Sequence, residues 1–290
     1  MKIITDNAAD LLPQEVQDLD IQVAPLFIQF PDQTEIASAD IAPDAFYDRL
    51  RSIAPQVPTT SQPSPGEFIK LYRQVAAAGE EVLSLHISSG LSGTYNAASL
   101  AAGQVSEAKV TVVDTQTLSP AERFQVLAAA YAAKAGWSTP QILERLNEIR
   151  AASEAIFTLE TLEYLARGGR IGRVQALAGS ILHIKPIIHV DKADGKYSTI
   201  GRARTMNQAI SGIADHLAKQ YDKQTPVWAT VIHGQAADRA EQMAEILKER
   251  LNVGKLDIIR ISPVLGVHTG PGVVGAGIVP LKLFDGLGLI

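Results

Sequence analysis

The sequence predicts an α/β protein with a parallel-sheet domain over residues 1–153 and a mixed-sheet domain over residues 154–290. Three observations support this prediction. Strand and helix patterns alternate through the first half, as in a parallel sheet whose strands are joined by helices. In the second half, Asp194-Gly195 separates two strand patterns, which indicates an antiparallel hairpin. A chain of 290 residues also exceeds the usual size of one domain.

Hydrophobic periodicity places the elements of the first half. The expected strands cover residues 2–5, 21–30, 82–87 and 109–114, and the expected helices begin near residues 13 and 94 or cover residues 45–53, 66–78, 120–136 and 139–152. Residues 54–65 contain four prolines, which restrict themselves and the residues before them. This segment is therefore expected to be a rigid loop with Thr59, Thr60 and Ser61 at its tip.

The second half combines the hairpin with further strands and helices. The expected strands cover residues 156–159, 186–191, 196–200, 227–233, 256–261 and 273–279, and the expected helices cover residues 162–166, 206–220 and 236–251. Residues 264–272 are rich in glycine and are expected to form a flexible loop. Residues 261–281 carry no charge, but five glycines and three prolines favour a buried strand, loop and strand over a membrane span.

Composition excludes several classes of function. The net charge is −5 and the basic residues are dispersed, so neither nucleic acid nor a membrane surface is an expected partner. The chain has no cysteine, which excludes disulfides, zinc–thiolate sites and thiol catalysis. The histidines lack metal-ligand spacing, so we expect no metal and no cofactor. The amino terminus lacks the apolar core of a signal peptide, and a cytoplasmic location is expected.

The segment from residue 82 to residue 98 reads as a strand, a tight turn and a helix. Ser88, Ser89, Ser92 and Thr94 supply hydroxyl groups at the turn, and the glycines let the backbone approach a ligand. The first turn of the helix adds N–H groups without internal partners. Together these groups favour an anion held by neutral donors, because the turn contains no Lys or Arg. A simple helix cap would explain the same residues equally well.

Ligands of open parallel sheets bind beyond the carboxyl ends of the strands. By this rule, the turn with Ser92 lies in a crevice at the carboxyl ends of the strands. We expect the Thr59–Ser61 segment to face the same crevice.

The motifs along the chain together resemble the DegV family. They are Thr59-Thr-Ser-Gln-Pro-Ser-Pro65, Ser88-Ser-Gly-Leu-Ser-Gly-Thr-Tyr95, Leu162-Glu-Tyr-Leu-Ala-Arg-Gly-Gly-Arg-Ile-Gly-Arg173, Gly201-Arg-Ala-Arg204 and His268-Thr-Gly-Pro-Gly272. The resemblance implies a DegV-like fold of two α/β domains with one long-chain fatty acid, such as palmitate, in a buried tunnel between them. It also implies a carrier without catalytic activity that presents the carboxylate to a separate fatty acid kinase subunit.

The resemblance further assigns roles to individual residues. Thr60, Ser92 and His268 would bind the carboxylate, and Arg170 and Arg202 would dock the partner kinase. The loop residues that would support the carboxylate site are Thr59, Ser61, Ser89 and Gly93. Asp6-Asn7 stands where many members have Asp-Ser, which leaves the role of residue 7 open.

No tail cavity can be derived from the sequence. The candidate walls are the apolar segment 174–184, Phe27, Ile28 and Leu265, although an ordinary core explains any single one of these residues better.

A serine hydrolase or acyltransferase is the main alternative. Ser92, Asp114 and His268 occur in the chain order of an α/β-hydrolase triad. However, the elbow of such enzymes reads Gly-x-Ser-x-Gly, and Thr94 stands at the second glycine here.

A phosphate-binding enzyme is a second alternative because the chain contains glycine-rich turns. No Gly-x-x-x-x-Gly-Lys-Ser/Thr motif occurs, and Arg167-Gly-Gly-Arg-Ile-Gly172 lacks the spacing of a dinucleotide fingerprint. We therefore do not expect the chain to bind ATP by itself.

Overall fold

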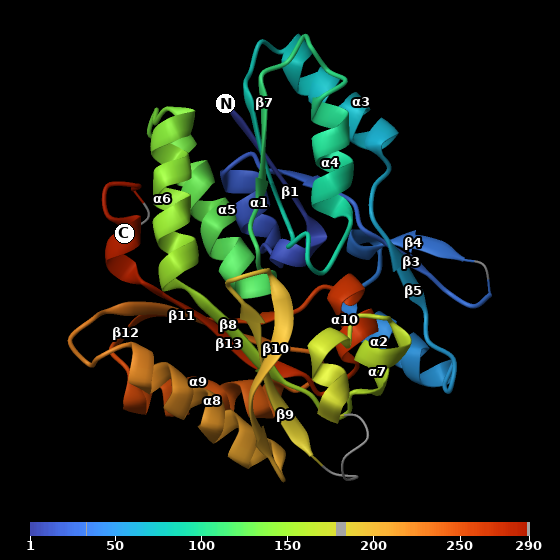
Figure 1. The fold of residues 1–290 in the computed structure, drawn as a ribbon, viewed down its shortest axis with the longest axis vertical. Helices are drawn as coiled ribbons and strands as arrows, with labels where there is room; N and C mark the ends of the chain where they lie inside the picture. Colours follow the sequence, from blue (N-terminus) through green and yellow to red (C-terminus); the bar gives the residue numbers. More distant parts are fainter. Residues whose placement is uncertain (33, 178–183, 289–290) are drawn as a thin grey trace.

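The computed structural model describes residues 1–32, 34–177 and 184–288, and its strands form three sheets (Figure 1). The first sheet is parallel, with strand order β2-β1-β6-β7, as predicted for the first half. Its strands are β1 (Lys2–Asp6), β2 (Gln22–Ala24), β6 (Val82–His86) and β7 (Val110–Asp114).

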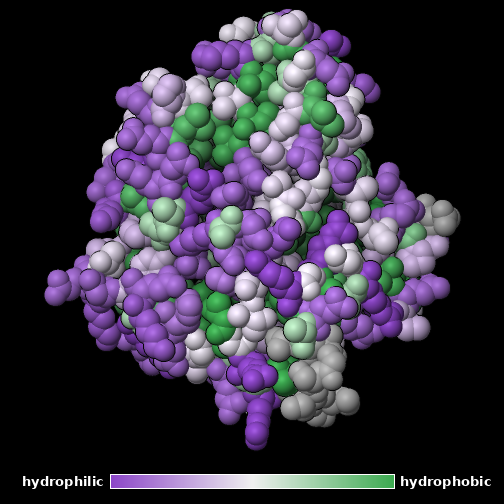
Figure 2. All heavy atoms as spheres, in the orientation of Figure 1, coloured by the Kyte–Doolittle hydropathy of each residue, from purple (hydrophilic) through white to green (hydrophobic). Residues whose placement is uncertain are grey.

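Helices cover both faces of this sheet. Successive side chains of a strand point to opposite faces, so the apolar neighbours Ile3 and Ile4 need a packing partner on each face. Ile3 packs with α5 and α6, whereas Ile4 packs with α3 and α4 on the other side (Figure 1). The helices of this half are α1 (Pro13–Asp18), α2 (Pro43–Ser52), α3 (Pro65–Ala77), α4 (Thr94–Ala102), α5 (Ser119–Lys134) and α6 (Thr139–Ala152). Figure 2 shows a mainly polar face on which apolar side chains gather near β7, whose residues are half-buried.

The single strand predicted at residues 21–30 is wrong. This segment forms β2 and, after Pro25, β3 (Phe27–Gln29), which belongs to a different sheet. Proline has no N–H for a strand ladder, and the next N–H, of Leu26, donates to Asn7 Oδ1 at 2.8 Å. Asn7 therefore has a structural role where β2 turns away from the first sheet.

The proline-rich segment 54–65 is also more regular than predicted. Thr59–Ser61 form strand β5, which pairs antiparallel with β3, and β4 (Glu35–Ala37) completes a three-stranded sheet. The loop predicted at these residues was therefore wrong, although Thr60, Ser61 and Ser92 do line one cavity, as expected for a shared crevice. Thr60 pairs with Ile28 and belongs to a small separate sheet, because the β-branched threonines suit an extended strand.

The second half forms a six-stranded sheet with order β10-β9-β8-β13-β11-β12. Only the β11–β12 pair is parallel, so the mixed sheet and the hairpin between β9 and β10 are confirmed. Its strands are β8 (Glu154–Thr158), β9 (Lys185–Asp191), β10 (Lys196–Ala203), β11 (Val227–His233), β12 (Val253–Arg260) and β13 (Val274–Pro280). Helices α8 (Met206–Gln220) and α9 (Ala237–Arg250) cover one face (Figure 1).

Two short helices and four 3-10 helices complete the described fold. They are α7 (Glu163–Arg167), α10 (Pro263–Thr269) and the 3-10 helices η1 (Asn7–Ala9), η2 (Ser38–Asp40), η3 (Gly172–Leu177) and η4 (Leu281–Phe284). The flexible loop predicted at residues 264–272 is wrong, because α10 is a helix whose seven residues are all buried. Pro263 suits the first helical position, and Gly270, at φ +68°, ends the helix.

The proposed domain boundary falls where α6 ends and β8 begins, and it stays a prediction. Helix α5 packs on both large sheets, and one apolar cluster joins Phe124 of α5 to Leu85 of β6 and to Trp228 of β11. The two halves therefore share a core. Within the described residues, the structure contains no helix with the length and apolar character that crossing a bilayer requires.

Candidate functional site

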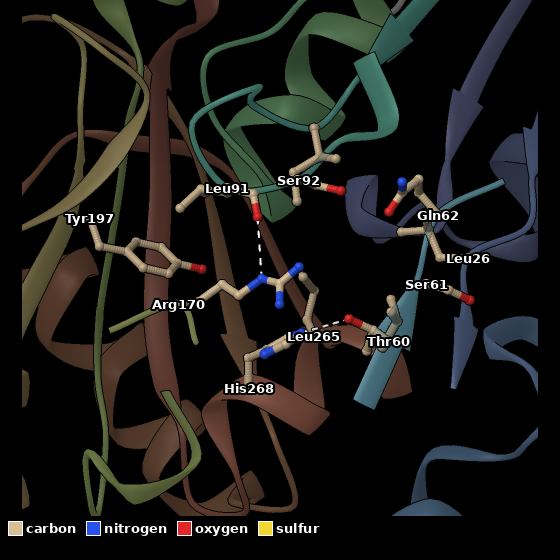
Figure 3. A pocket seen from close by; sticks show the side chains of 12 residues that line it. Leu26, Thr60, Ser61, Gln62, Leu91, Ser92, Arg170, Tyr197, Leu265 and His268 are labelled. Carbon is tan, nitrogen blue, oxygen red and sulfur yellow. Dashed lines mark hydrogen bonds between the residues drawn. The ribbon is translucent and has the colours of Figure 1, made fainter. Parts of the chain in front are cut away.

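A cavity of about 40 Å³ lies where the Ser92 turn, β5, α10 and the β9–β10 hairpin meet (Figure 3). It brings together all three residues that the resemblance assigned to a carboxylate, Thr60, Ser92 and His268, from three distant parts of the chain. The cavity is lined by Leu26, Thr60, Ser61, Gln62, Ile87, Leu91, Ser92, Arg170, Tyr197, Val264, Leu265 and His268.

Thr60 and His268 form a hydrogen-bonded pair across the cavity wall. Thr60 Oγ1 lies 2.9 Å from His268 Nε2, and the two side chains point toward each other (Figure 3). The imidazole is 9% exposed, and its Nδ1 has no partner in the part of the chain that the structure describes. Burial, followed by the positive charge of Arg170, lowers the pKa of His268 to about 4. The ring is therefore neutral near pH 7 and carries a single N–H.

The position of that N–H determines what Thr60 can donate. A buried N–H without a partner is less well tolerated than an acceptor without one, so the proton belongs on Nε2, which faces Thr60. The His268 N–H then donates to Thr60 Oγ1. The hydroxyl hydrogen of Thr60 is left to be donated into the cavity.

The segment around His268 is closely packed and is not a flexible loop. A Cβ atom on Gly168 would lie 2.2 Å from His268 Nδ1, and one on Gly270 would lie 2.2 Å from the Tyr164 ring. Both glycines therefore allow α7 to pack directly on α10. The glycines around His268 serve this contact, which explains why a glycine-rich segment is helical and buried.

Ser92 has a similar arrangement at the start of α4. Its Oγ lies 2.8 Å from the Oγ1 of Thr94 and accepts the Thr94 N–H at 3.3 Å. Thr94 is fully buried and has no other acceptor among the described residues, so we assign it as the donor to Ser92; otherwise its hydroxyl hydrogen would be buried without an acceptor. Ser92 is thereby left with a hydrogen to donate into the cavity.

Arg170 forms part of the cavity wall, which the expected docking role did not indicate. Its guanidinium donates to the carbonyls of Gly168 at 2.8 Å and Leu91 at 3.4 Å, and it extends between Leu91 and His268 (Figure 3). Among the described residues, it has no carboxylate partner. Its charge therefore favours an anion in the cavity. Arg202, by contrast, is exposed on β10 and does not line the cavity.

Of the four predicted supporting residues, two lie at the cavity and two are exposed outside it. Ser61 lines the cavity, and Gly93 lies beside it, with a Cβ position 3.1 Å from Gln62 Nε2. Thr59 is exposed on β5, where its side chain points away from that of Thr60. Ser89 is exposed and donates to Asp114 Oδ2 at 2.5 Å. These four assignments as supporting residues stay predictions.

The hydrolase alternative gains no support from the geometry. Asp114 accepts hydrogen bonds from Ser89 and from the Gln116 N–H, so it does not orient His268. Ser92 is paired with Thr94, and His268 is paired with Thr60. A triad would require Ser92 to bond His268 and His268 to bond Asp114.

The remaining histidines also have local partners. His86 lies between Ser84 and Asp6, and the His233 Nδ1 accepts the Ala236 N–H. His183 lies outside the described residues. No cluster of three potential metal ligands occurs in the described ranges.

A second, larger hollow of about 650 Å³ lies directly beside the cavity and shares four of its residues, Leu91, Ser92, Arg170 and Tyr197. Arg173 and Lys196 also line it, and none of its described lining residues is acidic. Its other lining residues are Ser89, Gly90, Gly93, Asn96, Gly169 and Gly172. An anion bound in the cavity would therefore have a basic hollow next to it.

The cavity is smaller than the tunnel we expected. A volume of about 40 Å³ holds roughly three water molecules, so it suits a head group and not an aliphatic chain. Apolar side chains fill the space beneath it, among them Leu26, Ile28, Val174 and Leu265. Most of the predicted wall at residues 174–184 lies outside the described residues.

Sequence reasoning missed several wall residues. Leu26, Gln62 and Tyr197 reach the cavity only through the packing of distant elements. Gln62 directly follows strand β5, two residues after Thr60, and this spacing could have indicated that both side chains lie on the same side of an extended chain. Thr94 was recognised as a hydroxyl of the turn, but its bond to Ser92 was not.

Comparisons with known proteins show which chains and folds this protein is similar to. The family model described as DegV, an uncharacterised protein family, matches residues 1–281. A DegV domain-containing protein of Deinococcus radiodurans is 37% identical over 278 residues, which are 96% of this chain and 95% of that protein.

Two solved structures show the same fold. One, described as fatty acid binding of a DegV family protein from Thermus thermophilus, has a TM-score of 0.89 and 33% identity over 97% of this chain and 99% of that one. A stearic acid-binding protein from Eubacterium ventriosum has a TM-score of 0.87 and 27% identity, over 96% and 98% of the two chains.

Proposed function

The chain belongs to the DegV family, and on that premise we propose that it binds one long-chain fatty acid with the carboxylate in the cavity. The observation that carries this proposal is the convergence of two prepared hydroxyl donors and one arginine. With the protons placed as argued above, Thr60 accepts a hydrogen bond from His268 and Ser92 accepts one from Thr94, which leaves each hydroxyl with a hydrogen to donate to the carboxylate. Solved relatives described as fatty-acid-binding proteins support the same ligand class.

The carboxylate gains position and charge compensation in this site. A buried carboxylate costs several kcal/mol unless hydrogen bonds replace its water. The hydroxyls of Thr60 and Ser92 supply two such bonds, and Arg170 supplies a positive charge. His268 stays neutral and acts through Thr60.

The tail provides most of the affinity. Burial stabilises the complex by roughly 0.8 kcal/mol per methylene, so about fourteen methylenes give on the order of 10 kcal/mol before the costs of ordering are subtracted. The apolar residues that line the cavity and pack behind it, such as Leu26 and Leu265, have to move apart to admit the tail. Their cohesion therefore opposes binding, and the net gain is smaller than the gross value.

We propose further that the protein is a carrier and not an enzyme, and that a separate kinase phosphorylates the carboxylate. The hollow beside the cavity supports this role, because Arg170 and Lys196 line it next to the proposed carboxylate position, whereas Arg173 is paired with Asp191 and Asp194. Arg170 borders both spaces, so it would act on the ligand and on the partner. The exposed Arg202 would act on the partner alone. A cytoplasmic location fits such a partner.

The direct test is mass spectrometry of lipid extracted from the purified protein. We expect one fatty acid per chain, and reduced recovery from a Thr60→Val, Ser92→Ala double variant.

A second test adds a bacterial fatty acid kinase subunit and ATP, and we expect acyl phosphate only when this protein is present. The absence of any fatty acid, in the extract and after incubation with palmitate, would contradict the proposed function.

A further inference from the structure

The tip of the β9–β10 hairpin is docked on the turn that carries Ser92. Ser88 is fully buried at this contact, and its hydroxyl donates to the Gly195 carbonyl at 2.8 Å. The same Ser88 Oγ accepts the Gly90 N–H at 3.1 Å. One side chain therefore joins the hairpin of the second half to the turn of the first half.

The two backbones approach each other too closely for side chains. A Cβ atom on Gly90 would lie 2.6 Å from the Asp194 carbonyl oxygen and 2.9 Å from that of Gly195. A Cβ atom on Gly195 would lie 2.0 Å from Ser88 Oγ. Real Cβ atoms do not approach this closely. Substitution of Gly90 must therefore move the tip away from the turn, because its neighbours are backbone carbonyls, and substitution of Gly195 must displace the Ser88 hydroxyl.

The hairpin tip is itself rigid. The Gly195 N–H donates to the Asp191 carbonyl at 2.8 Å, and the Lys196 N–H donates to the Asp194 carboxylate at 3.2 Å. Arg173 bonds the carboxylates of Asp191 and Asp194 from the side, at 3.3 and 3.0 Å. A rigid tip can fix the position of whatever it contacts.

The contact continues directly to Ser92. The Ser88 carbonyl accepts the N–H groups of Leu91 and Ser92, each at 3.0 Å. Moving Ser88 therefore moves the backbone of Ser92 and the Leu91 carbonyl, which also accepts a bond from Arg170. The chain of contacts runs from Gly195 through Ser88 to two groups of the cavity wall.

We propose that the hairpin tip, residues 191–195, is a latch whose contact with Ser88 and Gly90 positions Ser92 and controls how fast a bound fatty acid leaves. This proposal rests on the proposed function, because it concerns the same cavity. Ser88, Gly90 and Gly195 are positioning residues and do not touch the ligand. The latch has to open when the small cavity widens for the tail.

The test compares an alanine substitution at the contact with an alanine substitution at a glycine outside it. Gly90→Ala inserts a methyl group at the contact, whereas Gly103→Ala inserts one where the nearest atom lies 3.7 Å away. Neither glycine has a positive φ, so both variants accept alanine without backbone strain. Ser88→Ala removes the bond to Gly195 without adding bulk, and it serves if Gly90→Ala does not fold.

Two measurements give independent answers. Hydrogen exchange of the ligand-free protein should be at least tenfold faster at the Leu91 and Ser92 amides in Gly90→Ala and Ser88→Ala, and unchanged in Gly103→Ala. Release of [1-¹³C]palmitate should be at least tenfold faster in the same two variants, with a shifted pH titration of the carboxyl signal. Unchanged exchange in both variants overturns the latch, whether or not the wild-type protein binds palmitate. Unchanged release beside faster exchange also overturns it. Wild-type protein that binds no palmitate refutes the proposed function alone.

Discussion

Replacing Thr60 by Val should weaken fatty acid binding without changing the fold. Valine has nearly the same shape as threonine and suits strand β5 equally well. The change removes the hydroxyl that lies 2.9 Å from His268 Nε2 and leaves a methyl group in its place. The carboxylate then loses one of its two hydroxyl donors, and the His268 N–H loses its partner.

The size of the effect follows from the charge of the acceptor. A hydrogen bond to a charged group contributes roughly 1.5–3 kcal/mol, which corresponds to a loss of affinity of about 10-fold to 100-fold. The tail contacts are untouched, so binding should be weakened and not abolished. Thr59→Val is the matched control, because Thr59 is the exposed neighbour whose side chain points to the opposite side of the strand.

The assay is displacement of a fluorescent fatty acid by decanoate, whose short tail keeps the affinities within a measurable range. Circular dichroism and thermal melting check that both variants fold. Equal affinities of Thr60→Val and the wild-type protein would refute the role of Thr60. An equal loss in Thr59→Val would show that the effect comes from the strand and not from the hydroxyl.

Three further predictions concern charge. Arg170→Gln should weaken both palmitate binding and kinase-dependent acyl phosphate formation, whereas Arg202→Gln should reduce only the second; equal effects on binding would contradict the assignment. Burial raises the pKa of Asp10 to about 6, so its stabilising contribution of about 3 kcal/mol is present below its unfolded pKa and is lost as pH rises through 6. In Asp10→Asn, urea titrations should lack this fall between pH 4 and pH 7. The lowered pKa of His268, about 4, has the opposite effect: the free energy of unfolding falls by about 3 kcal/mol as pH falls from 6.5 toward 4. In His268→Gln, urea titrations should lack this fall.

Local sequence signals predicted the elements well where those signals are complete. The range of α8 is the predicted one, with the Thr205 hydroxyl accepting the Gln208 N–H at 3.3 Å at its start. The range of β11 is also the predicted one, and the Asp194-Gly195 turn forms the hairpin. In these cases the periodicity and the capping residues all lie within a few positions of each other, so no distant contact is needed to define the element.

The site depends on contacts that no local signal contains. Thr60 and His268 are 208 positions apart, and they meet only because β5 pairs with β3 while α10 packs against both. The sequence motifs of the family identified the two residues, but they could not place Thr60 on a strand. They also could not show that Thr94 lies behind Ser92, or that Arg170 lines the cavity.

Glycine caused the error at residues 264–272, because two physical uses of glycine look alike in a sequence. The glycines near His268 suggested a flexible loop, yet each one marks a close contact. A Cβ atom on Gly266 would lie 2.6 Å from the Phe46 ring, and those on Gly168 and Gly270 would lie 2.2 Å from His268 and Tyr164. Such glycines hold elements together, so alanine substitution at Gly168 should displace the imidazole from Thr60. The same substitution at Gly136, where a Cβ meets no atom within 4 Å, should cost only the strain of its positive φ.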